Sequence, residues 1–260
     1  MPSEITRLIS DTAYQTYEKR LLKEVKGQPV PRHVAIIMDG NRRFAEELGM
    51  DRGKGHLSGR NKLEEVLGWC LEMDIKILTV YAFSTENFAR STDEVQNLMA
   101  LFEKSFRDVG DDERVHKNGI RVRVLGQRAM IPEKVLAAIA YAEERTENYT
   151  NYSFNICMAY GGREEILNAL KAVATKVKNG ELRVEDIDER VFTQHLYTAD
   201  LPDPDLVLRT SGEERISNFL LWQLAYSELY FTDVYWPGMR KIDFLRALRS
   251  YQQRKRRIGA

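Results

Sequence analysis

The sequence predicts a single α/β domain built on an open, mostly parallel six-stranded sheet with helices on both faces. Six short segments rich in Val, Ile, Leu, Tyr and Phe have the near-continuous apolar character of strands that are covered on both sides. Segments with a helical spacing of apolar residues separate most of them, as in proteins built from parallel strands. The expected strands are residues 34–40, 76–83, 120–126, 153–160, 206–212 and 228–234.

The segments between the strands carry the spacing and the end signals of helices. Ser91, with Glu94 three residues later, has the pattern of a capping box, and Pro132 stands at a first-turn position. The third strand, "RVRVL", alternates apolar and charged residues, so we expect it near an edge of the sheet. The clearest helical segments are residues 56–73, 91–109, 132–146 and 163–180.

The composition is that of an ordinary globular protein without a strong overall charge. Of the residues, 43% are hydrophobic and 30% charged, and 39 basic side chains balance 39 acidic ones. No net field would draw the protein to nucleic acid, so any basic site must be local. We find no linker, repeat or low-complexity tract. We therefore expect one domain over residues 1–260, with a helical extension over 1–30 and a basic helix and tail over 241–260.

Cysteine usage and the apolar segments indicate a cytoplasmic protein. Cys70 and Cys157 stand alone in apolar segments, which provides neither a disulfide framework nor a zinc cluster. The N-terminal segment carries acids and lacks the apolar region of a secretory signal. The longest mostly apolar stretch, "NFLLWQLAY", is too short to cross a bilayer, although a peripheral contact with a membrane surface remains open.

The first expected strand leads directly into the turn Asp39-Gly40-Asn41-Arg42-Arg43. In open parallel sheets, ligands bind beyond the carboxyl ends of the strands. Asp39 can hold Mg²⁺ together with phosphate oxygens, and Gly40 permits a close approach of the backbone. Arg42 and Arg43 can bind phosphate. The alternative is an aspartate that caps a helix, followed by two solvated arginines.

Other segments add groups of the same chemistry. Residues 51–60 interleave cations with glycines, and residues 84–87 are small polar groups that follow the second strand. Arg209 and Arg215 follow the fifth strand, and arginine forks match the geometry of a diphosphate. Glu228 stands beside apolar sequence and needs a cation or a metal as partner. Flexible basic loops and ordinary turns are the alternatives. Together these segments favour a site for a polyanionic ligand with Mg²⁺.

Four motifs then identify a family. "HVAIIMDGNRRFA", "YAFSTENFAR", "AYGGREEI" and "LVLRTSGEERISNFLLWQLAYSELYFTDVYWP" strongly resemble the cis-prenyltransferases, the undecaprenyl diphosphate synthase family, from about His33 to Asp243. The resemblance implies an enzyme that uses Mg²⁺ to condense isopentenyl diphosphate repeatedly onto an allylic diphosphate, either geranylgeranyl or farnesyl diphosphate. The implied product is a long-chain polyprenyl diphosphate, a precursor of glycosyl carrier lipid.

The resemblance also implies roles for individual residues. Asp39 and Asn87 are expected to be catalytic, and Asp39 and Glu228 to bind Mg²⁺. The residues expected at the allylic diphosphate are Gly40, Asn41, Arg42, Arg43, Arg52 and His56. Those expected to contact or position the substrates are Phe44, Ser84, Thr85, Glu86, Phe88 and Arg90. Those expected at isopentenyl diphosphate are Arg209, Arg215, Ile216 and Ser217. Because an amide does not titrate usefully, we expect Asn87 to order the substrate while a diphosphate oxygen takes the proton.

The family pattern further implies an apolar tunnel for the product chain. We expect the helices at 53–73 and 91–109 to line it, together with the strands beside Ala82 and Phe154. The candidate lining residues are Met73, Leu98, Met99, Leu101 and Phe102. Ordinary core packing explains each of these residues equally well.

Two departures from the bacterial pattern resemble archaeal and eukaryotic members. Residues 42–44 and Phe88 stand where bacterial-type members usually have Gly-Arg-Trp and Trp, which favours geranylgeranyl diphosphate as primer. Arg257 and Gly259 resemble the Arg-x-Gly tail of those members, which implies a homodimer whose tail reaches the neighbour's diphosphate site. The alternatives for this tail are a basic helix end and a segment that meets anionic lipid.

Other functions stay open at this level. One is a non-catalytic partner subunit of a heteromeric cis-prenyltransferase, which would be expected to lack the metal ligand and substrate-binding positions that this chain keeps. Another is a phosphotransferase or phosphatase that acts on a small phosphorylated metabolite. Nucleic-acid binding would depend only on the basic tail, and we expect none.

Overall fold

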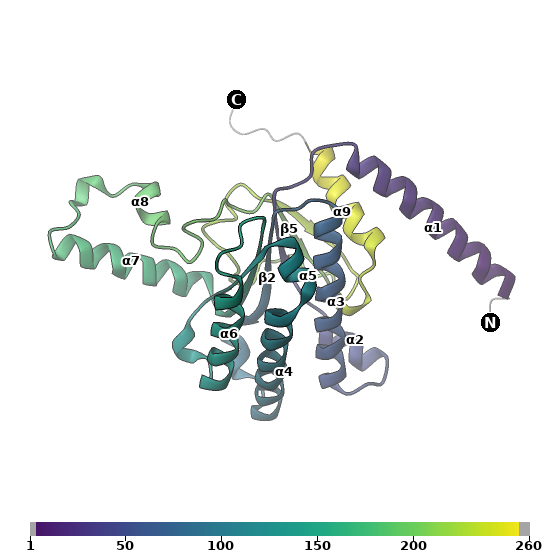
Figure 1. The fold of residues 1–260 in the computed structure, drawn as a ribbon, viewed down its shortest axis with the longest axis horizontal. Coiled ribbons are helices and arrows are strands. Elements are labelled where there is room, and N and C mark those ends of the chain that lie inside the picture. Colours follow the sequence, from purple (N-terminus) through teal and green to yellow (C-terminus); the bar gives the residue numbers. More distant parts are fainter. Residues whose placement is uncertain (1–3, 255–260) are drawn as a thin grey trace.

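The computed structural model describes residues 4–254. Its centre is a six-stranded, all-parallel sheet with the strand order β3-β4-β2-β1-β5-β6 (Figure 1). The predicted strands are confirmed, and β3 lies at an edge, as its alternating pattern predicted. The strands are β1 (His33–Ile37), β2 (Ile77–Ser84), β3 (Ile120–Leu125), β4 (Tyr152–Tyr160), β5 (Leu206–Arg209) and β6 (Glu228–Phe231).

Helices cover the sheet and connect the strands, except that residues 210–227 join β5 to β6 through turns alone. The α-helices are α1 (Glu4–Lys26), α2 (Asn41–Glu47), α3 (Arg52–Glu72), α4 (Thr92–Asp111), α5 (Glu113–Asn118), α6 (Glu133–Thr146), α7 (Gly162–Lys178), α8 (Glu189–Thr193) and α9 (Lys241–Gln253). The 3₁₀ helices are η1 (Thr85–Ala89), η2 (Arg128–Met130), η3 (Val184–Asp186) and η4 (Trp236–Gly238). The predicted helices correspond to α3, α4, α6 and α7.

Two predicted helix starts need correction. Ser91 is the N-cap residue of α4 but makes no side-chain cap hydrogen bond, so the predicted capping box is absent. The carboxylate of Glu94 binds basic side chains at the functional site instead. Pro132 is the N-cap residue of α6, one position before the helix begins.

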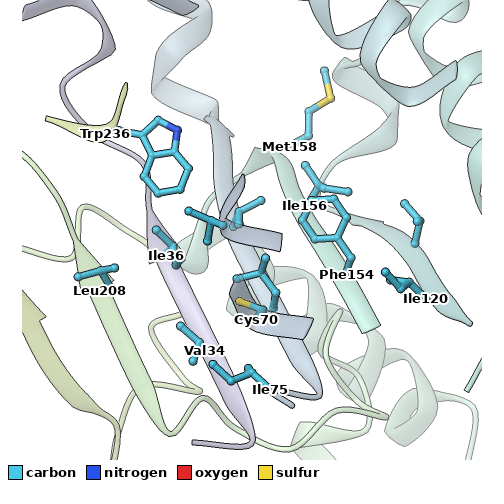
Figure 2. Close-up of a cluster of buried hydrophobic side chains, with 14 of the residues drawn as sticks. Val34, Ile36, Cys70, Ile75, Ile120, Phe154, Ile156, Met158, Leu208 and Trp236 are labelled. Carbon is cyan, nitrogen blue, oxygen red and sulfur yellow. The ribbon is translucent and has the colours of Figure 1, made fainter. Parts of the chain in front are cut away.

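Alternate residues of the strands feed two cores on opposite faces of the sheet. Val34 and Ile36 of β1 contribute to one core, and Ala35 and Ile37 to the other, because successive strand residues point to opposite sides. Helices α3, α4, α6 and α9 supply the first core. Figure 2 shows members of it from several elements: Val34, Cys70, Phe154, Leu208 and Trp236.

Helix α1 packs against α9 and extends away from the sheet at the end that carries the N-terminus (Figure 1). Leu21 and Val25 are buried in the first core, which anchors the second half of α1. The ring of Tyr14 lies 4.9 Å from the Arg240 guanidinium carbon. Within residues 4–254, none of the helices combines the length and the apolar character that a bilayer-spanning segment needs.

Candidate active site

A cavity of about 780 Å³ opens beyond the carboxyl ends of β2, β1 and β5. These three strands are neighbours in the sheet, so the polar residues that follow them converge, although they are far apart in the sequence. The residues that sequence analysis expected in the site and that line this cavity are Asp39, Gly40, Asn41, Arg42, Arg43, His56, Ser84, Glu86, Asn87, Arg90, Arg209 and Ser217.

The centre of the cavity is an ion pair between the ends of β1 and β5. Arg209, whose side chain is 4% exposed, donates to Asp39 Oδ2 at 2.8 Å and to Ser217 Oγ at 2.8 Å. Burial raises the pKa of Asp39, but the hydrogen bond and charge of Arg209 outweigh it, with help from Arg43, so that the pKa lies below its usual value. Asp39 is therefore an anion at neutral pH. Nε of Arg209 has no partner among the described residues.

A second group of charges surrounds Glu213 in the loop after β5. Arg43 donates to Ser211 Oγ at 2.6 Å and to Glu213 Oε1 at 3.2 Å, and Arg215 forms an ion pair with the other oxygen of Glu213. The side chain of Arg215 is 61% exposed and does not line the cavity. One carboxylate thus pairs with two arginines.

A third group gathers around Glu94 of α4. Its Oε1 lies 3.0 Å from Arg90 Nη1, 3.4 Å from His56 Nε2 and 3.9 Å from Arg42 Nε. These basic side chains come from the segment after η1, from α3 and from α2, so Glu94 ties three elements together. Burial lowers the pKa of His56, with the charges of Arg90 and Arg42 acting in the same direction. His56 is therefore neutral near pH 7 and can offer the cavity a neutral hydrogen-bonding group.

Ser84 and Asn87 form a capping box at the start of η1. The amide Oδ1 of Asn87 accepts a hydrogen bond from the backbone N–H of Ser84 at 3.2 Å. Because an N–H group can only donate, this contact assigns the oxygen of the amide and leaves its NH₂ group for the cavity. Asn87 can therefore donate to a bound anion.

Asp39 fits a Mg²⁺ site as a single protein ligand. Within residues 4–254, His, Cys, Asp and Glu side chains form no group of three or more that could hold a metal ion by themselves. Mg²⁺ at phosphate sites is commonly bound through one or two carboxylates, substrate oxygens and water. The side chain of Asp39 is 29% exposed and lines the cavity among cations, so its carboxylate fits an ion that arrives with a diphosphate.

Several expected residues lie outside the cavity lining. Among the described residues these are Phe44, Arg52, Thr85, Phe88, Arg215, Ile216 and Glu228. Arg52 forms an exposed ion pair with Glu46, and the ring of Phe88 packs edge-on against Phe83. Ile216 packs against the second core. Arg257 and Gly259 lie outside the described residues.

The position of Glu228 corrects one expectation. Glu228 opens β6 and pairs with Leu206, the first residue of β5, whereas the site lies beyond the last residue, Arg209. In a parallel sheet the first and the last residues of the strands lie at opposite ends of the strands. Within one chain, Glu228 therefore does not lie near Asp39. The carboxylate of Glu228 is instead 2.6 Å from Arg254 Nη1.

Sequence analysis missed Asn218 as a site residue. It lines the cavity, and its amide donates to Glu86 at 3.1 Å and to Glu164 at 3.3 Å. Its backbone has a φ of 63°, and that of Ser217 a φ of 47°, a left-handed conformation that costs energy outside glycine. The sequence signal that could have identified Asn218 is its position, a polar residue in the "SNF" turn directly after Ser217.

A second, apolar cavity of about 110 Å³ adjoins the first between α3, α4 and the sheet. Met38, Asn41, His56, Ala82 and Leu98 line both cavities, so the two meet at these side chains. Of the predicted tunnel residues, Leu98, Leu101, Phe102, Ala82 and Phe154 line it. Met73 and Met99 do not line it and pack elsewhere in the first core.

Comparison with known proteins agrees with this geometry. A protein-family model described as "Putative undecaprenyl diphosphate synthase" matches residues 37–259. A protein of Thermoplasma volcanium is 56% identical over 98% of this chain and 99% of its own length. A protein of Pyrococcus abyssi is 54% identical over 99% of this chain and 97% of its own length. Both are named tritrans,polycis-undecaprenyl-diphosphate synthase (geranylgeranyl-diphosphate specific).

Solved structures share the fold. Lavandulyl diphosphate synthase from Lavandula x intermedia, in complex with dimethylallyl diphosphate, is 39% identical with a TM-score of 0.84, covering 89% of this chain and 99% of that one. A probable undecaprenyl diphosphate synthase from Campylobacter jejuni is 32% identical with a TM-score of 0.72, covering 89% of this chain and 100% of that one.

Proposed function

Because the chain belongs to the undecaprenyl diphosphate synthase family of cis-prenyltransferases, we propose that it extends geranylgeranyl diphosphate with successive isopentenyl diphosphate units into a long-chain polyprenyl diphosphate. The choice of primer follows the names of the archaeal relatives and the motif at residues 42–44. The product would serve as a precursor of glycosyl carrier lipid. Farnesyl diphosphate is the other primer to test.

One observation carries the proposal: a polar cavity rich in arginine meets an apolar cavity at shared side chains. An allylic diphosphate has this division, with an anionic head and a hydrocarbon tail. Arg42, Arg43 and Arg209 would face the diphosphates, while Leu98 and Ala82 lie where a tail would begin. A small phosphorylated metabolite would not need the apolar cavity.

The reaction requires one bond to break, one to form and one proton to leave. The bond between C1 of the allylic substrate and its diphosphate oxygen breaks, and C4 of isopentenyl diphosphate bonds to C1. A proton then leaves C2 of the isopentenyl group and restores a double bond. The departing diphosphate gains negative charge. The guanidinium groups of Arg43 and Arg209, held in place beside Asp39, therefore favour the transition state over the bound substrate.

Mg²⁺ would be held by Asp39 together with diphosphate oxygens, and when bound it supplies positive charge to the leaving group. Asn87 would donate its NH₂ hydrogens to a diphosphate oxygen and so orient the substrate. Ser217 and Arg209 would hold the isopentenyl diphosphate from the β5 side. The C2 proton would pass to a diphosphate oxygen, because the Asn87 amide is no useful base.

We further propose that the protein works as a homodimer that can touch a membrane surface. β6 is an edge strand of the sheet, and Tyr226, just before it, is 81% exposed, so this edge is open to a second copy. A non-catalytic partner subunit is disfavoured because Asp39, Asn87 and Arg209 are all retained. The Arg257 and Gly259 tail as a part of the neighbour's site stays a prediction.

The test is incorporation of labelled isopentenyl diphosphate into butanol-extractable lipid, with Mg²⁺ and either primer, for wild type and Asp39→Asn. We expect long products with geranylgeranyl diphosphate and a rate lower by about 10²–10³-fold in the variant, since one preorganised electrostatic contact is lost. Asp186→Asn, a change in an exposed ion pair with Arg183, is the matched control and should keep the wild-type rate. A folded wild-type protein that makes no lipid with either primer would contradict the proposal.

A further inference from the structure

The apolar cavity is far smaller than the product that the proposed function requires. A cavity of 150 Å³ holds a molecule of about the size of benzene, so one of about 110 Å³ has room for roughly one five-carbon unit. A polyprenyl chain contains many such units. The growing chain must therefore extend beyond this cavity, and the packing of each wall indicates where it leaves.

Most of the walls are held by buried contacts. The floor is the sheet, with Phe154 and Ile156 of β4 buried in the first core. Trp236 closes one side and donates its indole N–H to the backbone oxygen of Gly59 at 2.8 Å, which fixes α3 to η4. On the other side, α4 packs extensively on α6, where Arg145 donates to the Gly110 carbonyl at 2.7 Å.

The wall between α3 and α4 is different because an ion pair spans it, beside apolar side chains such as Leu63 and Phe106. Arg60 of α3 lines the apolar cavity, yet its guanidinium lies 2.9 Å from Asp108 Oδ2 of α4 and 3.0 Å from Glu64 Oε1 of its own helix. The Arg60 and Asp108 side chains are 27% and 40% exposed. Figure 1 shows α3 and α4 lying side by side over the sheet. The stem of Arg60 thus lies along the cavity while its charge reaches solvent.

We infer that the Arg60–Asp108 ion pair is the point at which the growing product leaves the cavity, and that it limits product length. This inference rests on the proposed function. Exposed ion pairs contribute little to stability, so this wall opens more readily than the buried ones. A hydrocarbon tail that passes between α3 and α4 leaves its diphosphate head in the site, so elongation continues. A closed wall stops elongation, because the cavity has no room for the tail.

The first experiment compares the product lengths made by wild type and Asp108→Asn. The variant keeps the shape of the side chain but removes its charge from Arg60. We expect the product distribution to shift toward longer chains by about one five-carbon unit or more, since loss of an exposed pair favours the open wall only modestly. Glu103→Gln, which removes the charge partner of Arg107 on the same helix without crossing to α3, is the matched control and should leave the lengths unchanged.

A cross-link tests the same point in the opposite direction. Arg60→Cys combined with Asp108→Cys allows a short bismaleimide to join α3 to α4, while the native Cys70 and Cys157 are buried and protected from the reagent. We expect the cross-linked enzyme to add few or no isopentenyl units, because the four five-carbon units of the primer already exceed the cavity, and each single-cysteine variant with the reagent to make long products. Full-length product from the cross-linked enzyme would overturn the inference. Failure of the wild type to make any labelled lipid would instead contradict the proposed function.

Discussion

The two ends of β1 both carry buried polar groups, but those groups are satisfied in different ways. At the amino end, His33 is 1% exposed, and its ring nitrogens lie 2.8 Å from the Pro202 carbonyl and 2.8 Å from Thr79 Oγ1. The Pro202 carbonyl can only accept, so the ring proton is on Nδ1 and Nε2 accepts from Thr79. Asp205 accepts from the backbone N–H of His33 at 2.9 Å. Each polar atom of the His33 side chain thus has a partner within the protein.

At the carboxyl end of β1 the hydrogen bonding of the buried polar groups is incomplete. Nε of Arg209 and Oδ1 of Asn41 are buried without a hydrogen-bond partner among the described residues. Buried polar groups in folded proteins are nearly always paired, so unpaired ones need a reason. Here both belong to residues that line the large cavity. The comparison thus sets a polar network whose hydrogen bonds are complete against one, beside the cavity, whose hydrogen bonds are incomplete.

Arg209→Lys should have the largest effect of the substitutions at the carboxyl end of β1, because it disrupts the polar network around Asp39. Lysine keeps the charge but cannot replace the guanidinium fork that reaches Asp39 and Ser217 together. We expect kcat/KM for isopentenyl diphosphate to fall by about 10²–10³-fold, as when a preorganised donor is lost from an active site.

Arg123→Lys is the matched control for this change. Arg123 donates to both carboxylate oxygens of Asp200, at 2.7 and 2.8 Å, and does not line the large cavity. The same chemical change there should leave the steady-state kinetics as in wild type. Equal effects of the two substitutions would show that the fork of Arg209 has no special part in binding.

The sequence predicts those site residues that directly follow the carboxyl ends of the predicted strands. Asp39 and Arg209 were placed together by one rule, that ligands lie beyond the carboxyl ends of parallel strands. By the same rule Glu228, the first residue of β6, lies at the amino ends of the strands, away from the site. Its apolar sequence context indicated a cation or a metal as partner, and the cation is Arg254. The choice of a metal followed family resemblance, which does not state which chain supplies a residue.

Other misses have a tertiary origin. Ser91 and Glu94 satisfy the local capping pattern, but the carboxylate of Glu94 lies among basic side chains, two of which come from distant helices, His56 of α3 and Arg42 of α2. No local pattern can reveal competitors that only the fold brings near. The order of the strands, which makes β2, β1 and β5 neighbours, is likewise absent from the pattern of apolar segments. The motifs therefore predicted the chemistry of the site better than its boundaries.

The closed network at His33 predicts a dependence of stability on pH. Burial lowers the pKa of His33 to about 4 from an ordinary 6.5. Between these values the unfolded chain binds a proton that the native protein does not, so the free energy of unfolding falls as the pH falls from 6.5 toward 4. This histidine should contribute a loss of about 3 kcal/mol over that window.

The measurement is urea unfolding at several pH values between 7 and 4 for wild type and His33→Asn. The variant is less stable at pH 7, because it loses packing and hydrogen bonds, but it lacks the titrating group. The stability difference between the two proteins should therefore shrink as the pH falls. Parallel pH profiles would mean that His33 does not stay neutral in the native protein.

The smallest expected effect concerns Asn87, on the open side of the comparison. Asn87→Asp keeps an oxygen for the backbone N–H of Ser84 but replaces the NH₂ donor with negative charge. If Asn87 donates to a diphosphate, the variant should raise KM for the allylic substrate and lower kcat/KM by about tenfold, the cost of one lost hydrogen bond to a charged group. If the residue at this position removed the proton, a carboxylate would be the better base and kcat would hold or rise. Asn148→Asp, at an exposed position after α6, controls for the added charge.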